Sequence, residues 1–137
     1  REGELTPDRF HLNARTAHAL DILSEQQPGD ILVVPGQFGE RHAGRSVRRA
    51  CEVFASGEFG LGAFLVGCML LTHPERLVRW EQLHMDCPGD EFAPDCGGVF
   101  SSASCFLFDD DGVEFGAISI GVPYECYGSV SGFLPQE

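Results

Sequence analysis

Residues 99–122 read VFSSASCFLFDDDGVEFGAISIGV, and this stretch decides the fold of the second half of the chain. Two largely apolar segments, 99–108 and 113–122, flank the turn sequence DDDG at 109–112. An Asp-Gly pair between two such segments is the strongest short-range signal for a β-hairpin. The apolar pattern of the second segment changes phase near Gly116, which predicts a β-bulge there.

The first half of the chain carries mostly helical signals. A hydroxyl cap followed by Pro and Asp at 6–8 predicts a helix start, and apolar residues at helical spacing continue as far as Pro28. The elements predicted before the hairpin are helices over about 6–27, 45–55, 59–71 and 72–77, a buried strand over 31–34, an extended segment over about 78–85, and a long loop over about 88–98.

Helices therefore come first and β-structure last, which favours an α+β fold over alternating α/β. We expect a single domain over residues 1–137, with a helical N-terminal half packed on a small antiparallel sheet formed by the C-terminal half. The longest apolar stretch, Leu61–Leu71, is shorter than the roughly 18 residues that a membrane-spanning helix needs.

The charge of the chain is unevenly divided. All nine basic residues are arginines, the last of them is Arg79, and eleven of the 21 carboxylates follow it. Nearly all of the formal net charge of -12 therefore lies in residues 80–137. Such a field repels phosphate groups and membrane surfaces and attracts cations or a basic protein surface. It argues against direct binding to nucleic acid or to a membrane.

This charge leads to the first functional hypothesis. We expect a small, acidic, soluble interaction or regulatory protein that docks on a basic partner, as inhibitors, immunity-type proteins and nucleic-acid mimics do. The acidic C-terminal half would form the docking face. The predicted partner-binding residues are Asp90, Glu91, Asp95, Asp110 and Asp111.

Residues 39–46 (GERHAGRS) resemble the phosphate-binding pattern G-x-x-x-x-G-K-[ST], except that Arg45 replaces the lysine. The planar guanidinium does not replace an ammonium point charge, and the chain is short for a nucleotide-binding parallel sheet, so nucleotide hydrolysis is disfavoured. A simpler anion site remains, unless these arginines pair with the acids of the chain itself. The predicted anion-binding residues are Arg41, Arg45, Ser46, Arg48 and Arg49, with His42 beside them.

Residues 84–96 pack seven candidate metal ligands into thirteen positions. Thiolate and imidazole suit zinc, whereas clustered carboxylates suit Ca²⁺ or Mg²⁺, so the mixture predicts a divalent ion without selecting one. Two alternatives stay open, namely an acidic surface loop and a Cys87–Cys96 disulfide. The candidate ligands are His84, Asp86, Cys87, Asp90, Glu91, Asp95 and Cys96.

Together these two segments give the second functional hypothesis, a small metal-dependent enzyme acting on a phosphate-bearing substrate. It requires the acids of residues 84–96 and the arginines of residues 41–49 to line a common cleft. No catalytic constellation is recognisable in the sequence itself.

The six cysteines contain no C-x-x-C pair, and Cys51, Cys68 and Cys105 lie inside apolar patterns. A free thiol in such a setting behaves as a small hydrophobic group. We therefore expect mostly buried thiols and a cytoplasmic location, where thiols stay reduced.

Overall fold

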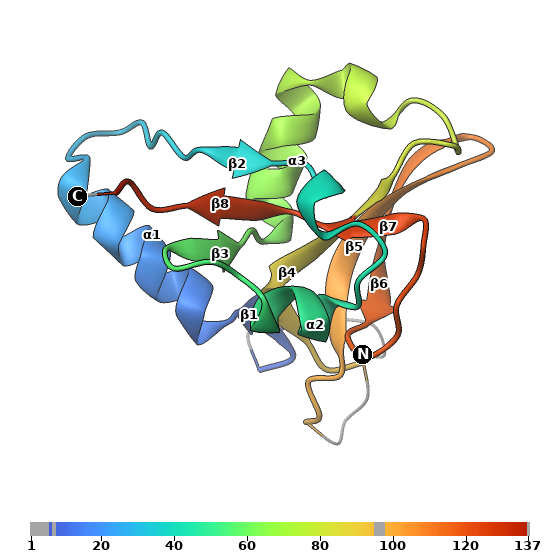
Figure 1. The fold of residues 1–137 in the computed structure, drawn as a ribbon, viewed down its shortest axis with the longest axis horizontal. Helices are drawn as coiled ribbons and strands as arrows, with labels where there is room; N and C mark the ends of the chain where they lie inside the picture. The colour runs from blue at the N-terminus through green and yellow to red at the C-terminus, as the bar shows by residue number, and fades with distance from the viewer. Residues whose placement is uncertain (1–5, 7, 95–97, 137) are drawn as a thin grey trace.

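The structure is a computed structural model that describes residues 6, 8–94 and 98–136. Its helices and its two sheets form an α+β fold, as the sequence predicts, with the α-helices before residue 73 (Figure 1). The helices are α1 (Ala14–Gln26), α2 (Val47–Glu52) and α3 (Ala63–Thr72), with the 3-10 helices η1 (Glu40–His42) and η2 (Pro74–Leu77).

The strands form a larger and a smaller sheet. In the larger sheet the order is β1-β4-β5-β6, and β7 pairs in parallel with β4; in the smaller sheet it is β2-β8-β3. The first half of the chain thus also contributes strands. The strands are β1 (Phe10–Leu12), β2 (Gly36–Gln37), β3 (Glu58–Gly60), β4 (His84–Phe92), β5 (Ser102–Asp109), β6 (Gly112–Ser119), β7 (Tyr127–Ser129) and β8 (Ser131–Phe133).

The predicted hairpin is confirmed. Strands β5 and β6 pair antiparallel without a break from Ser102↔Ser119 to Asp109↔Gly112. The predicted bulge is wrong, because Gly116 pairs with Cys105 in regular register. β6 is an edge strand of the sheet, and its apolar pattern is therefore not forced to follow one buried face.

Strand β4 contradicts the predicted loop. It pairs with β5 along one edge, and along the other with β7 at Asp86 and with β1 at Asp90. A bulge between Cys87 and Phe92 lets the strand accommodate Pro88, which has no N–H to donate to a ladder. The Pro88-Gly89 pair therefore correctly indicated an irregular backbone, but this backbone lies within a strand of the sheet and not in a loop.

Helix α1 begins at Ala14, not near Thr6. Asn13 caps it by accepting a 2.9 Å hydrogen bond from the Thr16 backbone N–H, while residues 10–12 pair with β4. The strand predicted over 31–34 is also absent, and the Ile31 side chain is 82% exposed. The second predicted helix is confirmed in shorter form as α2, capped by Ser46.

The apolar segment predicted as one core helix divides into β3 and α3. The backbones of β3 and β4 approach closely at Gly60 and Gly89. A Cβ atom on Gly89 would lie 2.6 Å from the Gly60 carbonyl oxygen, so this approach requires glycine. Helix α3 buries Val66 but leaves Phe64 82% and Leu71 84% exposed. It is therefore a helix on the surface, with apolar side chains on its outer side as well as its inner side.

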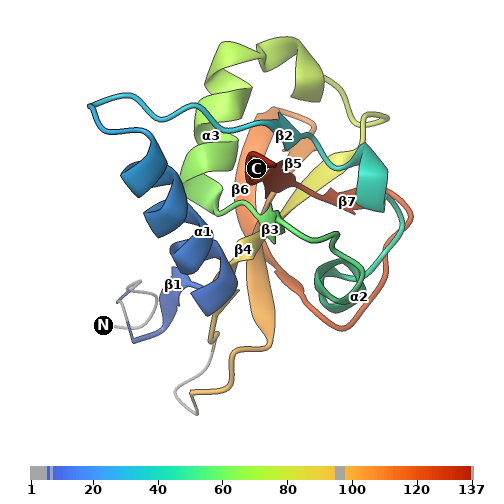
Figure 2. The same ribbon diagram turned by 60° about the vertical axis from the view of Figure 1, so that its left-hand side comes forward.

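The core lies between α1, α3 and the two sheets. Its fully buried side chains include Leu23 of α1, Phe59 of β3, Met85 of β4 and Val130, which links β7 to β8. Figure 2 shows α1 and α2 on different sides of the strands, with α3 above. In the described part of the chain, no helix is long and apolar enough to cross a membrane.

Candidate functional site

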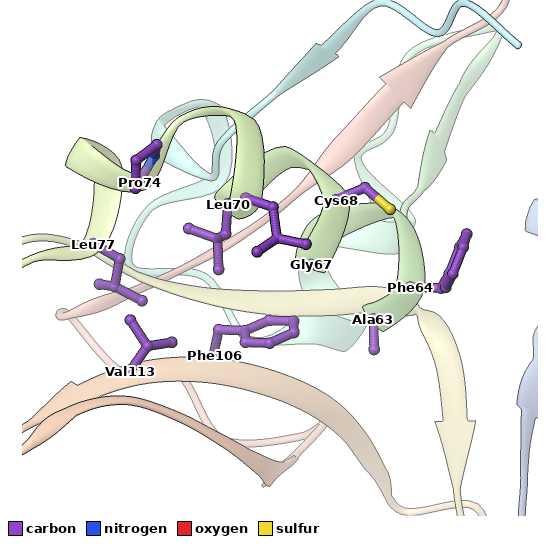
Figure 3. A pocket seen from close by; sticks show the side chains of 10 residues that line it. Ala63, Phe64, Gly67, Cys68, Leu70, Pro74, Leu77, Phe106 and Val113 are labelled. Carbon is purple, nitrogen blue, oxygen red and sulfur yellow. The ribbon is translucent and has the colours of Figure 1, made fainter. Parts of the chain in front are cut away.

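An apolar groove of about 480 Å³ lies between α3, η2 and the β5–β6 hairpin. Figure 3 shows Gly67 and Leu70 of α3 facing Phe106, with Val113 facing Leu77 at the other end. A Cβ atom on Gly67 would lie 3.7 Å from the Phe106 ring, an ordinary van der Waals distance, so α3 and the sheet are nearly in contact there. The walls of the groove are almost entirely carbon.

The apolar surface extends beyond the groove. Phe64 and Leu71 stand on its rim, and Phe115, 52% exposed, lies with its ring centroid 5.3 Å from that of Phe106. Single exposed apolar side chains are normal on a protein surface, but a contiguous patch around a groove is a feature of interaction sites.

One end of the groove is acidic. Val113 follows directly after the hairpin turn, whose residues 109–111 are three exposed aspartates. The nearby Arg76 is engaged elsewhere, because its guanidinium donates to the Phe38 and Leu83 carbonyls and lies 3.3 Å from a Glu40 oxygen. The negative field of the turn is therefore not cancelled by this arginine.

No protein family, curated protein or solved structure matches this chain. Any functional assignment therefore depends on the chemistry of the residues themselves.

The predicted acidic docking residues do not share one face. Asp110 and Asp111 are exposed at the hairpin turn, but Asp90 is only 6% exposed and points inward. Its carboxylate accepts hydrogen bonds from Ser104 Oγ and, at 2.7 Å, from the Ala63 N–H at the start of α3. Asp90 is therefore a cap for α3 and not a docking residue.

Glu91 is partly exposed and lies 3.1 Å from His11 Nε2. Asp95, the remaining predicted docking residue, lies outside the described residues, as does Cys96 of the predicted metal set.

The described members of the predicted metal set lie on β4, whose alternation separates them. Cys87 packs in the apolar core beside Met85, whereas His84 and Asp86 face the opposite side of the sheet. Within the described residues, no three His, Cys, Asp or Glu side chains gather where they could hold a metal ion. Cys87 is a free thiol, and Cys96, its partner in the alternative disulfide, lies outside the described residues.

His84 and Asp86 instead form part of a buried polar cluster with Ser129. Asp86 pairs with Ser129 in the parallel β4–β7 ladder, and the His84 ring lies between Trp80 and Tyr127 at centroid distances of 5.0 Å. Neither His84 ring nitrogen, nor Asp86 Oδ1, nor Ser129 Oγ has a hydrogen-bond partner among the described residues. Burial raises the pKa of Asp86 to about 7 and lowers that of His84.

The predicted anion cluster is largely occupied by contacts within the chain. Arg41 pairs with Glu58, Arg49 pairs with Glu52, and Arg45 donates to the Arg41 carbonyl and lies 2.9 Å from His42 Nδ1. The alternative prediction, that these arginines pair with the acids of the chain itself, therefore holds for Arg41 and Arg49, whereas Arg45 binds a carbonyl and an imidazole.

A phosphate loop is excluded by the backbone of residues 39–46. The N–H groups of His42, Ala43, Gly44 and Arg45 donate to backbone carbonyls, so they do not form a cradle for phosphate oxygens. Ser46 is occupied as the cap of α2. Arg48 differs from its neighbours, because its guanidinium makes no hydrogen bond to any described residue.

A second buried network was not predicted. Glu58 Oε1 lies 2.6 Å from His42 Nε2 and accepts a 2.7 Å bond from Ser131 Oγ, and Oε2 accepts from the Ala55 N–H at 2.9 Å. Arg45 donates to His42 Nδ1 in this arrangement, so Nε2 carries the proton given to Glu58. Burial opposes the charge of Glu58, but these hydrogen bonds lower its pKa overall. The network joins η1, β3 and β8.

The thiols are expected to differ strongly in reactivity. Cys68, on the rim of the groove, and Cys126 are exposed, whereas Cys87 and Cys105 are buried. Burial raises the pKa of Cys105 to about 12 and that of Cys87 well above its ordinary value. Iodoacetamide should therefore modify Cys68 and Cys126 in the folded protein within minutes and leave the other two intact, as peptide mass spectrometry would show. Equal labelling of Cys87 would contradict the packing described above.

Proposed function

We propose that the protein is an interaction module that binds a partner protein through the apolar groove. The bound segment is an amphipathic helix with an apolar side and basic residues at one end. The observation that carries the proposal is the continuous apolar surface formed by the groove and by the exposed Phe64 and Leu71.

The shape of the groove supports a helical ligand. Its upper wall is one side of α3, and its lower wall is the β5–β6 face. The groove of about 480 Å³, which Gly67 and Phe106 both line, offers room for a large apolar side chain. Helix-in-groove complexes use apolar residues at i, i+3, i+4 and i+7, which match such an elongated site.

The negative charge at one end of the groove supports a basic partner and indicates in which direction the ligand lies. The aspartates at 109–111 lie at the Val113 end, so the basic end of the ligand would lie there. This proposal keeps the hypothesis of an acidic protein with a basic partner but assigns the binding energy to apolar contacts. The acids would mainly accelerate encounter and orient the ligand, because exposed ion pairs add little affinity.

The test begins with a peptide selection. A random library displayed on phage is selected on the native protein, with prior removal of clones that bind Phe64→Asp. We expect sequences with apolar residues at helical spacing and Lys or Arg at one end. A synthetic peptide of the selected sequence, about 15 residues long so that it can form a helix, is then measured by fluorescence anisotropy.

Variants locate the site. Leu71→Asp is expected to weaken peptide binding at least tenfold, because a charge would enter an apolar contact. Ile31→Asp is the matched control, since Ile31 is as exposed as Phe64 but lies outside the groove, and it should bind normally. Changing Asp110 and Asp111 to Lys should reduce affinity severalfold and remove most of its dependence on salt.

Bound peptide should also protect Cys68, but not Cys126, from iodoacetamide. Selected sequences without an apolar pattern would overturn the proposal, as would equal loss of binding in Ile31→Asp. A dimer that Leu71→Asp converts to monomer would also overturn it, since the groove would then be covered by a second copy of the chain.

A further inference from the structure

A second pocket, of about 360 Å³, lies between α2 and the bulge of β4. Arg48 and Glu52 of α2 line it together with Pro88 and Glu91 of β4, and Val47 and Ile120 add apolar surface. The pocket therefore joins parts of the two segments, 41–49 and 84–96, that the sequence singled out separately. It lies apart from the groove, with which it shares no lining residue.

The wall formed by β4 is held rigidly. Asn13 donates from its side chain to the Pro88 carbonyl at 2.7 Å, and its backbone N–H donates to the Gly89 carbonyl at 2.8 Å. Gly89 in turn donates to the Leu61 carbonyl at 3.1 Å. Bulges fixed in this way often shape binding sites, and a preformed wall lowers the entropic cost of ligand binding.

Arg48 is placed at the pocket without being neutralised. Its backbone N–H donates to the Ile120 carbonyl at 2.9 Å, and its guanidinium lies over Gly121, 3.7 Å from where a Cβ atom would be. Unlike Arg41, Arg45 and Arg49, it makes no side-chain hydrogen bond or ion pair with a described residue. Its donors therefore remain available in a pocket that also has apolar walls.

The acids of the pocket restrict the ligand. Glu52 lies one helical turn after Arg48 on α2 and pairs with the exposed Arg49 at 3.2 Å. Glu91 lines the pocket from β4, 3.1 Å from His11 Nε2, and the neighbouring Asp90 also lines it while accepting hydrogen bonds from Ser104 and Ala63. These three carboxylates would repel a phosphate or a dicarboxylate. They would attract an ammonium group a short distance from the carboxylate that Arg48 binds.

We propose that this pocket binds a small zwitterion with an apolar body, of the class of the free apolar α-amino acids. Arg48 holds the carboxylate, Glu91 and Glu52 attract the ammonium group, and Val47, Pro88 and Ile120 contact the side chain. The volume lies at the lower end of the range of about 300–1,000 Å³ usual for small-molecule sites, as a ligand of this size requires.

Leucine and two analogues test the two charges separately. Isovaleric acid lacks the ammonium group, and isoamylamine lacks the carboxylate. In titrations followed by ¹H–¹⁵N NMR, leucine should shift the amides of residues around Arg48 and Pro88 and bind at least tenfold more tightly than either analogue. Arg48→Gln should weaken leucine binding at least tenfold. Arg79→Gln, which removes an exposed arginine outside the pocket, is the matched control and should bind normally.

Glu91→Gln should weaken leucine binding but leave isovaleric acid binding unchanged or tighter. Phe64→Asp should leave leucine binding unchanged, which separates this site from the groove. Absence of shifts at 20 mM leucine would overturn the proposal, and so would equal affinity for leucine and isovaleric acid. Unchanged leucine affinity in Arg48→Gln would show that the site lies elsewhere.

Discussion

Replacing Asp86 by Asn is expected to stabilise the protein by roughly 4 kcal/mol at pH 8 and hardly at all at pH 4. Asp86 is 2% exposed, its Oδ1 has no partner among the described residues, and burial raises its pKa from 3.8 to about 7. Asn has nearly the same shape but never ionises. A substitution that increases stability by this amount would be unusual, since most substitutions destabilise.

The direction of this pH dependence follows from the number of protons that the folded and unfolded states bind. Between pH 4 and 7 the folded state keeps the Asp86 proton and the unfolded state releases it, so rising pH favours unfolding. His84 acts in the opposite direction, because its lowered pKa means that stability is lost as pH falls below its ordinary value of 6.5. The difference in free energy of unfolding between Asp86→Asn and the parent protein isolates the contribution of Asp86.

Urea unfolding at pH 4, 5, 6, 7 and 8 measures this difference. Asp110→Asn is the control, because Asp110 is exposed at the hairpin turn and its replacement should change stability by less than about 0.5 kcal/mol at every pH. If Asp86→Asn were less stable than the parent at pH 8, the carboxylate would have to make stabilising contacts that the described residues do not provide.

Glu58→Ala is expected to have the largest destabilising effect, about 3–5 kcal/mol near pH 7. The substitution would leave His42, Ser131 and the Ala55 N–H without their shared acceptor, in a region that water does not reach. It would also remove the partner of Arg41, which lies 3.2 Å from Glu58 Oε1.

Urea unfolding compares Glu58→Ala with two other variants. Glu58→Gln keeps the shape and an acceptor oxygen and should cost less. Glu52→Ala removes an exposed partner of Arg49 and should cost less than about 1 kcal/mol. Because the pKa of Glu58 is lowered, its contribution is present above pH 4.5 and is lost as pH falls through the folded value. A loss below about 1 kcal/mol for Glu58→Ala at pH 7 would show that the network does not hold β3 and β8 together.

The sequence predicted the elements that local signals determine. The 109–112 turn specified the β5–β6 hairpin, and the apolar spacing before Pro28 specified most of α1. The part of β4 from Pro88 onward escaped prediction because its irregular backbone is stabilised by Asn13 and Leu61, which lie far away in the sequence. Long-range contacts override local propensity in such segments.

The candidate sites were predicted only in part. Asp110 and Asp111 lie where an exposed acidic surface was expected, but the groove beside them arises from α3, which was predicted to be buried. Apolar composition alone does not distinguish a core helix from one that offers its outer side to a partner. Arg48 and Glu91 were both singled out, yet their shared pocket depends on how α2 packs beside the β4 bulge.

Strand β8 lies between β2 and β3 in the smaller sheet, although it follows both of them by more than 70 positions in the sequence. During translation, β2 and β3 leave the ribosome long before the strand that joins them has been made. The smaller sheet therefore forms only after residues 131–133 have been synthesised, and pairing over such separations is slow. An interrupted translation product ending before residue 131 would expose two unpaired strands, the kind of surface that aggregates or binds chaperones.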